Sequence, residues 1–165
     1  MARLTLSGVA MCLAAGLASA QTSQQAPESR TVLGVGDEYL SAGAMAILAG
    51  QYDDGIRLTN LGLKRPQRPS DKAAALSNLC AAHAAKGEPD IAIKYCTESI
   101  EINDHSWRPY SNRSYAFYLK GDYARAQEDL KVAASLSPEA RQVAKIRGMI
   151  NERTLQPSVI TEEHQ

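Results

Sequence analysis

At 165 residues, the chain is long enough to form one domain with a buried core. Its 18 basic and 18 acidic residues balance. This balance argues against nucleic acid or an anionic membrane surface as the main partner. Aromatic residues are only 5% of the chain, while alanine is abundant. That composition suits closely packed helices with small residues at their contacts.

Residues 1–20 have the anatomy of a signal peptide. Arg3 supplies a positive start, the stretch from Leu4 to Leu17 is apolar, and the sequence A-S-A ends at Ala20. The apolar stretch is short for a membrane span. An uncleaved anchor or a buried helix fits the small-residue end less well. We therefore expect cleavage after Ala20 and a periplasmic or secreted protein, with no membrane span in the mature chain.

The remaining chain divides by composition into three parts. Residues 21–35 are polar at first and contain proline, which predicts a disordered linker. Residues 36–153 carry a periodic helical pattern and form the predicted domain. Residues 154–165 contain Pro157 and end in TEEHQ, so we expect a disordered tail.

Within the domain, residues 107–140 predict two amphipathic helices joined by a tight turn. Gly121 marks the turn, because glycine accepts the backbone angles that end a helix. Because they are spaced by three or four residues, the apolar or small residues of each helix lie on one of its faces. These residues are Tyr110, Ser114, Phe117 and Tyr118 in the first helix and Ala126, Leu130, Ala133 and Leu136 in the second.

The same pattern recurs upstream in the chain. Gly87 and Gly50 precede Gly121 at intervals close to a helical-repeat period of about 34 residues. The interval between Gly50 and Gly87 is slightly longer, and the extra residues fall in the loop sequence KRPQRPS. Three copies therefore cover approximately positions 36–70, 73–106 and 107–140. Such hairpins cannot bury both of their faces alone and are expected to stack on one another.

The period, the turn glycines and the small residues beside them resemble the tetratricopeptide repeat (TPR) family. This resemblance implies an all-α, right-handed solenoid of three helical hairpins with a capping helix. Two positions depart from the family pattern: Arg113 stands where leucine is usual, and Asp104 where proline is usual. We expect Ser70 to cap the third helix and the capping helix to start at Ser137-Pro138-Glu139 and end near Arg153.

Three glycines leave two interpretations of the first copy open. Gly43, Gly55 and Gly62 occupy helical positions, where glycine costs about 1 kcal/mol relative to alanine. The resemblance implies that helices approach closely at these positions. A loosely folded first repeat is the alternative.

No residue pattern indicates an active site. The sequence contains no metalloprotease, nucleophile-elbow, phosphate-loop or paired Cys-x-x-Cys motif. His83 aligns with Phe117 of the next copy and is expected to be packed rather than catalytic. We therefore expect no enzyme activity, no cofactor and no metal.

Two cysteines, Cys80 and Cys96, remain after removal of the leader. They lie equally far in sequence from Glu88, at the turn of the second hairpin, so they should stand at the same height in an antiparallel pair. Export permits a disulfide. The alternative is a pair of buried thiols that fill contact positions.

The resemblance also implies a concave face lined by the first helix of each pair, where a peptide binds. By register, the candidate binding residues are Asn78, Arg108, Asn112, Tyr115 and Tyr118. An asparagine amide can bond a peptide backbone, tyrosine supplies rigid contact area, and arginine can bind a carboxylate. For the two tyrosines, packing against the following helix is the alternative.

Some family members hold a terminal carboxylate with a clamp of lysine, asparagine and arginine. Leu40 and Ala44 replace the lysine and asparagine of the first copy, and Asn112 replaces the arginine, so the clamp is not supported. We expect an exported adaptor that binds a protein or peptide partner. A self-associating module, hence a homo-oligomer, or an accessory subunit of an envelope complex is the alternative.

Overall fold

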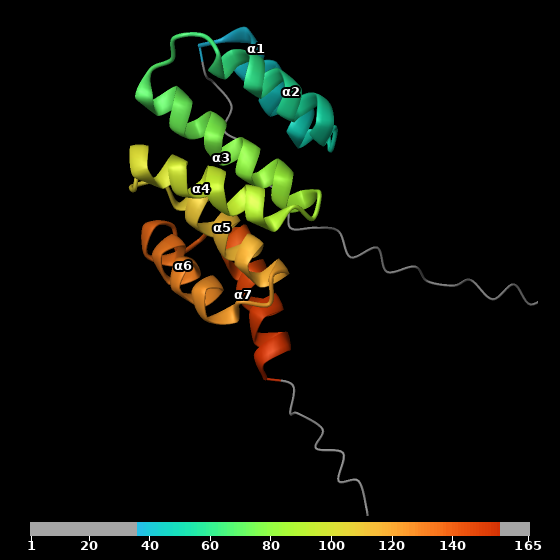
Figure 1. Cartoon of the computed structure of the whole chain (residues 1–165). Helices are drawn as coiled ribbons and strands as arrows, with labels where there is room; N and C mark the ends of the chain where they lie inside the picture. The colour runs from blue at the N-terminus through green and yellow to red at the C-terminus, as the bar shows by residue number, and fades with distance from the viewer. Residues whose placement is uncertain (1–35, 156–165) are drawn as a thin grey trace, which may run out of the picture.

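The computed structural model describes residues 36–155, which fold into seven helices and no strand (Figure 1). The helices are α1 (Glu38–Leu48), α2 (Tyr52–Leu63), α3 (Pro69–Ala85), α4 (Pro89–Ile102), α5 (Trp107–Leu119), α6 (Tyr123–Leu136) and α7 (Arg141–Thr154). The predicted signal peptide, the linker 21–35 and residues 156–165 of the predicted tail lie outside the described residues.

Three helical hairpins stack in chain order, as Figure 1 shows, and α7 follows them. The turns contain Gly50, Gly87 and Gly121, whose φ angles lie between 75° and 77°. An L-residue with a side chain rarely adopts such angles, whereas glycine does so at little cost. In the first turn the amide of Gln51 donates to the carbonyl of Ala46 at 2.9 Å, which caps the end of α1.

The helices form two layers. α1, α3, α5 and α7 contact one another in succession and make one layer, which we call the inner layer. α2, α4 and α6 each contact their own first helix and the first helix that follows, and no direct contact joins them to one another. This arrangement is the predicted all-α solenoid of three hairpins with a C-terminal helix.

The glycines of the first repeat are close-contact positions. A Cβ atom on Gly43 would come within 3.0 Å of the Thr59 hydroxyl oxygen in α2. Equivalent atoms on Gly55 and Gly62 would come equally close to the side chains of Ile47 and Leu40 in α1. The helices of this repeat therefore touch along their backbones, and the close-contact interpretation is confirmed.

Two predicted helix starts were wrong. α3 begins at Pro69 and not after Ser70, because proline fits the first helical position and needs no amide partner there. Arg68 precedes it and bonds Asp71 of the first turn at 2.8 Å. α7 begins at Arg141, because the residues around Pro138 form a turn in which the Ala140 amide donates to the Ser137 carbonyl at 3.2 Å.

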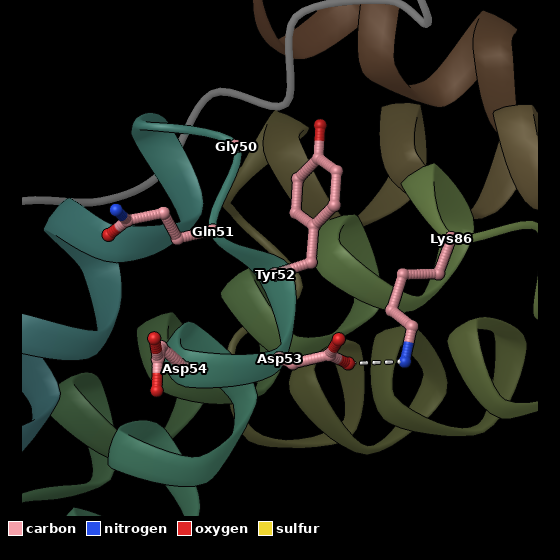
Figure 2. A pocket seen from close by; sticks show the side chains of 6 residues that line it. All are labelled: Gly50, Gln51, Tyr52, Asp53, Asp54 and Lys86. Atoms are coloured by element: carbon pink, nitrogen blue, oxygen red, sulfur yellow. Dashed lines mark hydrogen bonds and ion pairs between the residues drawn. The ribbon is translucent and has the colours of Figure 1, made fainter.

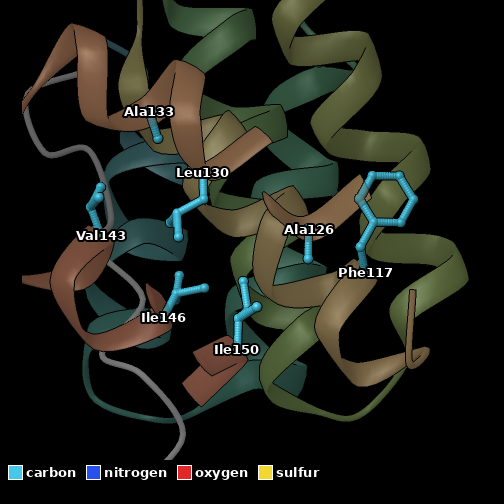
Figure 3. Packing of buried hydrophobic residues seen from close by; sticks show 7 residues of the cluster. All are labelled: Phe117, Ala126, Leu130, Ala133, Val143, Ile146 and Ile150. Atoms are coloured by element: carbon cyan, nitrogen blue, oxygen red, sulfur yellow. The ribbon is translucent and has the colours of Figure 1, made fainter. Parts of the chain in front are cut away.

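α7 completes the largest hydrophobic core in the described chain (Figure 3). Figure 3 shows the side chains of Ile146 and Ile150 directed toward Leu130 of α6. The members are Phe117, Ala126, Leu130, Ala133, Val143, Ile146 and Ile150. Burying these aliphatic groups contributes about 1.5–3 kcal/mol each for the larger side chains, so α7 stabilises the third hairpin as the predicted capping helix.

Candidate functional site

Asn112 joins three helices of the inner layer. Its Nδ2 donates to the carbonyl of Ser77 in α3 at 3.3 Å, and its Oδ1 accepts from Gln142 Nε2 in α7 at 2.8 Å. The side chain is only 2% exposed. In this structure the buried Asn112 amide therefore links α5 to α3 and α7 by hydrogen bonds. The sequence had predicted an exposed side chain that contacts a peptide.

Asn78 has the same register in α3 and is equally buried. Around these two amides, the described residues leave some hydrogen-bonding capacity unused. The buried atoms without a hydrogen-bond partner among the described residues include Ser77 Oγ, Ser111 Oγ and Gln142 Oε1. All three belong to inner-layer helices, so this layer is polar as well as closely packed.

Tyr115 and Tyr118 lie on α5 and are half-buried. Their rings stack with centroids 6.3 Å apart, and the Tyr118 ring meets that of Tyr123 at 5.8 Å. Tyr115 also packs against the hydrophobic clusters of the second and third repeats. Burial raises the pKa of Tyr115, and the nearby hydroxyls of Tyr118 and Tyr52 raise it further. Each tyrosine therefore packs on one side and keeps part of its surface accessible.

Tyr118 also contacts α7. Arg153 Nε donates to the Tyr118 hydroxyl at 3.4 Å. This hydrogen bond raises the pKa of Arg153, so the guanidinium stays charged at the edge of the tyrosine cluster.

Tyr52 is a site residue that the sequence analysis missed. It is the first residue of α2, and its phenol group is one of the causes that raise the pKa of Tyr115. Figure 2 shows its ring pointing away from the carboxylates of Asp53 and Asp54. The available signal was the tyrosine two positions after the turn glycine, which occurs as Gly50-Gln51-Tyr52 and again as Tyr123 in the third copy.

Tyr52 also lines a shallow pocket of about 330 Å³ (Figure 2). It is lined by the turn between α1 and α2 and by Lys86 at the end of α3. Lys86 Nζ lies 2.6 Å from Asp53 Oδ1, and Asp54 pairs with Arg57 at 3.1 Å. The charged residues that line the pocket are therefore paired within the chain, and the pocket offers no uncompensated charge for a ligand.

Arg108 lies in the first turn of α5 and is half-buried. Its guanidinium carbon stands 5.0 Å from the centroid of the Trp107 ring, a cation–π arrangement that restrains the side chain. Arg108 and the tyrosines Tyr115 and Tyr118 therefore share one helix, as the sequence predicted.

Cys80 and Cys96 form a disulfide within the second hairpin, with Cα atoms 5.3 Å apart. Both residues are fully buried. His83 is packed beside them: its ring stacks on Tyr95 at 5.4 Å, and its Nδ1 lies 2.6 Å from Glu88 Oε2. The two cysteines and His83 belong to the interior of the second repeat.

No group of three or more metal-binding side chains is arranged within residues 36–155 to hold an ion. None of the described helices is both long and apolar enough to cross a membrane.

Comparison with solved structures gives the fold. No protein-family model matches the chain. The second TPR domain of human RPAP3 superposes with a TM-score of 0.59 at 19% identity, covering 68% of this chain and 92% of that domain. The first TPR of Spaghetti superposes with a TM-score of 0.61 at 19% identity, covering 71% of this chain and 90% of that chain. The Sgt2 TPR domain of Aspergillus fumigatus superposes with a TM-score of 0.64 at 19% identity, covering 72% of this chain and 78% of that domain. The chain has the tetratricopeptide repeat fold.

One curated relative matches the chain in sequence. The photosystem I assembly protein Ycf3 of Rippkaea orientalis (strain PCC 8801 / RF-1) is 24% identical over 107 residues. The match covers 65% of this chain and 62% of the relative, so the chain spans less than two thirds of that protein. The TPR assignment rests on the shared period and on the superposed helices.

Proposed function

We propose that the chain is an exported, non-enzymatic TPR adaptor that binds a peptide segment of a partner protein on its inner layer. The observation that carries this proposal is the stacked, half-buried pair Tyr115 and Tyr118 on α5, the inner-layer helix that also carries Arg108. Aromatic side chains and arginine are the residue types that dominate binding energy at protein interfaces. Half-buried tyrosines are also held in place before binding, which lowers the entropy cost of association.

The structural neighbours support peptide binding as the general mode. The second RPAP3 domain was solved in complex with the HSP70 peptide SGPTIEEVD, and the first Spaghetti TPR with the HSP90 peptide SRMEEVD. In this chain Leu40 and Ala44 are buried apolar residues at the first-copy clamp positions. We propose that the ligand is held by aromatic contacts and not by capture of a terminal carboxylate.

Export is supported by the leader-like residues 1–20 and by the paired cysteines of the second hairpin. The expected mature chain begins at Gln21. Intact-mass analysis of protein recovered from the cell envelope tests this expectation. A full-length species that remains in the cytoplasm would contradict it.

Affinity capture tests the binding proposal. The mature chain and its Tyr118→Ala and Tyr115→Ala variants serve as bait for envelope extract. Tyr95→Ala, on α4 outside the inner layer, is the matched control. We expect the wild type and the control to retain the same partner. Each inner-layer variant should lose about 1–3 kcal/mol of affinity for it.

Thermal unfolding separates binding from folding in this experiment. If Tyr115→Ala and Tyr118→Ala retain full affinity but melt earlier, both tyrosines are only packing residues and the proposal fails.

The specificity of the binding surface is tested by calorimetric titration of the mature chain with the synthetic peptide SRMEEVD. We expect no saturable binding, because the described first repeat presents no basic side chain at its clamp positions; tight binding would show carboxylate recognition instead.

A further inference from the structure

The second helices of the three repeats lie on one side of the inner layer. In each repeat, the residue at one register of the first helix contacts the second helix of the same hairpin. These contacts are Gly43 against Thr59, Cys80 bonded to Cys96, and the Ser114 hydroxyl donating to the Ala126 carbonyl at 2.7 Å. The opposite side of the layer, which we call the inner face, has no described helix over it.

The middle of the inner face is nevertheless buried. Ala44 and Ala81 follow the residue that contacts the second helix by one position, and Asn78 precedes it by two. A helical period of 3.6 residues turns all three away from the second helices, by roughly 100–160°. Their exposed fractions are 0%, 1% and 2%, respectively. Leu48 and Leu119, which end the same face on α1 and α5, are 47% and 38% exposed, so burial is lost at the C-terminal ends of these helices.

The inner face is also engaged on all four inner-layer helices. The residues that already take part in an interaction are Ser41 of α1, Asn78 and Ala81 of α3, Arg108 of α5 and Lys145 of α7. These positions run across the array from its first helix to its last. One extended segment laid over the face would make contacts in such a line.

The segment that precedes α1 is long enough to cover this line. Residues 21–35 join the array at Gly36, beside Asp37, the N-cap residue of α1. Fifteen extended residues span up to about 50 Å. Adjacent packed helices lie about 8–10 Å apart, so the four helices of the inner layer extend over about 30 Å.

Residues 21–35 fit the buried part of the face better than the C-terminal segment does. Alternate helices of stacked hairpins are parallel, so residues 156–165 leave α7 at the end of the face where Leu48 and Leu119 are exposed. Residues 21–35 enter from the opposite end. The part nearest to α1 is apolar, with the sequence VLGV over 32–35, and it matches the small or apolar side chains of Ala44 and Ala81.

We infer that residues 21–35 lie across the inner face of the same copy as an internal ligand, with Val32, Leu33 and Val35 over α1 and α3. This role differs from the disordered linker that the composition predicts. A partner peptide that binds at Tyr115 and Tyr118 and extends onto α3 must displace the segment, which therefore lowers the affinity for the partner. The displacement rests on the proposed function, whereas the docking does not.

Hydrogen exchange of the mature chain, read by mass spectrometry, tests the docking. We expect the amides of residues 31–35 to exchange at least about tenfold more slowly than in a free peptide of the same sequence. Leu33→Asp should remove this protection, because it places a charge against an apolar surface. Gln24→Asp puts the same charge in the polar part of the segment and should preserve it. Exchange at the free-peptide rate in the wild type would overturn the inference.

A second pair of variants tests the docking from the side of the helices. Ala81→Gln fills the inner face with a larger side chain and should abolish the protection of residues 31–35. Ala42→Gln adds the same group to an exposed position of α1 and should leave the protection unchanged. Circular dichroism checks that both variants fold. Leu33 lies outside the seven helices, so the Leu33→Asp result decides the matter even if Ala81→Gln unfolds.

Dilution distinguishes docking within one copy from docking between copies. We expect the protection of residues 31–35 to be independent of protein concentration, and sedimentation velocity to show a monomer under the same conditions. Protection that disappears on dilution would show that the segment covers another copy, and it would overturn docking within the chain.

Partner capture tests the displacement. Leu33→Asp should bind the captured partner about tenfold more tightly than the wild type does, because the covered state no longer competes. Equal affinity would overturn the competition. If residues 31–35 are protected but Tyr118→Ala keeps full affinity, the proposed peptide site fails and the docking stands. If residues 31–35 exchange freely while Tyr118→Ala loses the partner, only the present inference fails.

Discussion

Gly43 and Thr59 occupy the same pair of positions in the first repeat as the disulfide-bonded Cys80 and Cys96 in the second. A Cβ atom on Gly43 would lie within 3.0 Å of the Thr59 hydroxyl oxygen. The Cα atoms of the two cysteines are 5.3 Å apart. Both repeats thus bring their helices unusually close at this register, one by removing a side chain and the other by a covalent bond.

We expect Gly43→Ala to destabilise the fold by about 1–3 kcal/mol, because the new methyl group overpacks the contact with α2. Gly148→Ala is the matched control. It adds the same methyl group to a helix where no described atom lies within 4 Å, so it should stabilise by about 0.5–1 kcal/mol. Urea unfolding of dilute protein measures both changes; equal effects would refute the packing argument.

Reduction of the Cys80–Cys96 disulfide should lower the free energy of unfolding by about 3 kcal/mol, since it frees a short loop in the unfolded chain. Labelling of the unfolded, unreduced mature protein should detect no free thiol. A variant with alanine at both positions is the control and should be insensitive to reductant. Two labelled thiols per chain would show that the bond does not form.

Arg113 forms a two-point ion pair with Asp129, at 2.7 and 2.8 Å. It also donates to the Thr97 hydroxyl at 3.0 Å and so links α4, α5 and α6. Arg113→Ala should cost about 3–5 kcal/mol, because it leaves the buried Asp129 carboxylate unpaired. Replacing both residues with leucine should restore most of that stability in thermal unfolding. A double variant as unstable as Arg113→Ala would contradict this explanation.

Glu88 should make stability depend on pH. The hydrogen bond with His83, followed by that with Lys86, lowers the pKa of Glu88 below its ordinary value of 4.5. A carboxyl group with a lowered folded pKa stabilises the fold above its unfolded pKa, and this contribution is lost as pH falls through the folded pKa.

The melting temperature should therefore fall as the solution is acidified below about pH 4.5. Glu88→Gln should melt earlier than the wild type at neutral pH, and the difference should shrink on acidification. A constant difference between wild type and Glu88→Gln across this range would rule out the carboxylate as its source.

The order of the elements was readable from the sequence because it depends on local conformation. Gly50, Gly87 and Gly121 recur at nearly equal intervals, and each supplies a backbone angle that other residues avoid. The apolar spacing between the glycines then places one packing face on each helix. Helix starts were less certain. Proline is compatible both with a turn, as at Pro138, and with a first helical position, as at Pro69.

Distances between helices were decided only by the tertiary structure. The register of Asn112 placed it on the inner layer, but α3 and α7 each approach α5 so closely that the Asn112 amide is used between helices. Equal distance from a turn made a bond between Cys80 and Cys96 possible, and the close approach of α3 and α4 brought their Cα atoms within bonding range. Tyr52 at the start of α2 raises the pKa of Tyr115 on α5, although the two tyrosines belong to different hairpins. A one-dimensional period specifies which face each residue occupies, whereas the separation of two faces depends on all the side chains packed between them.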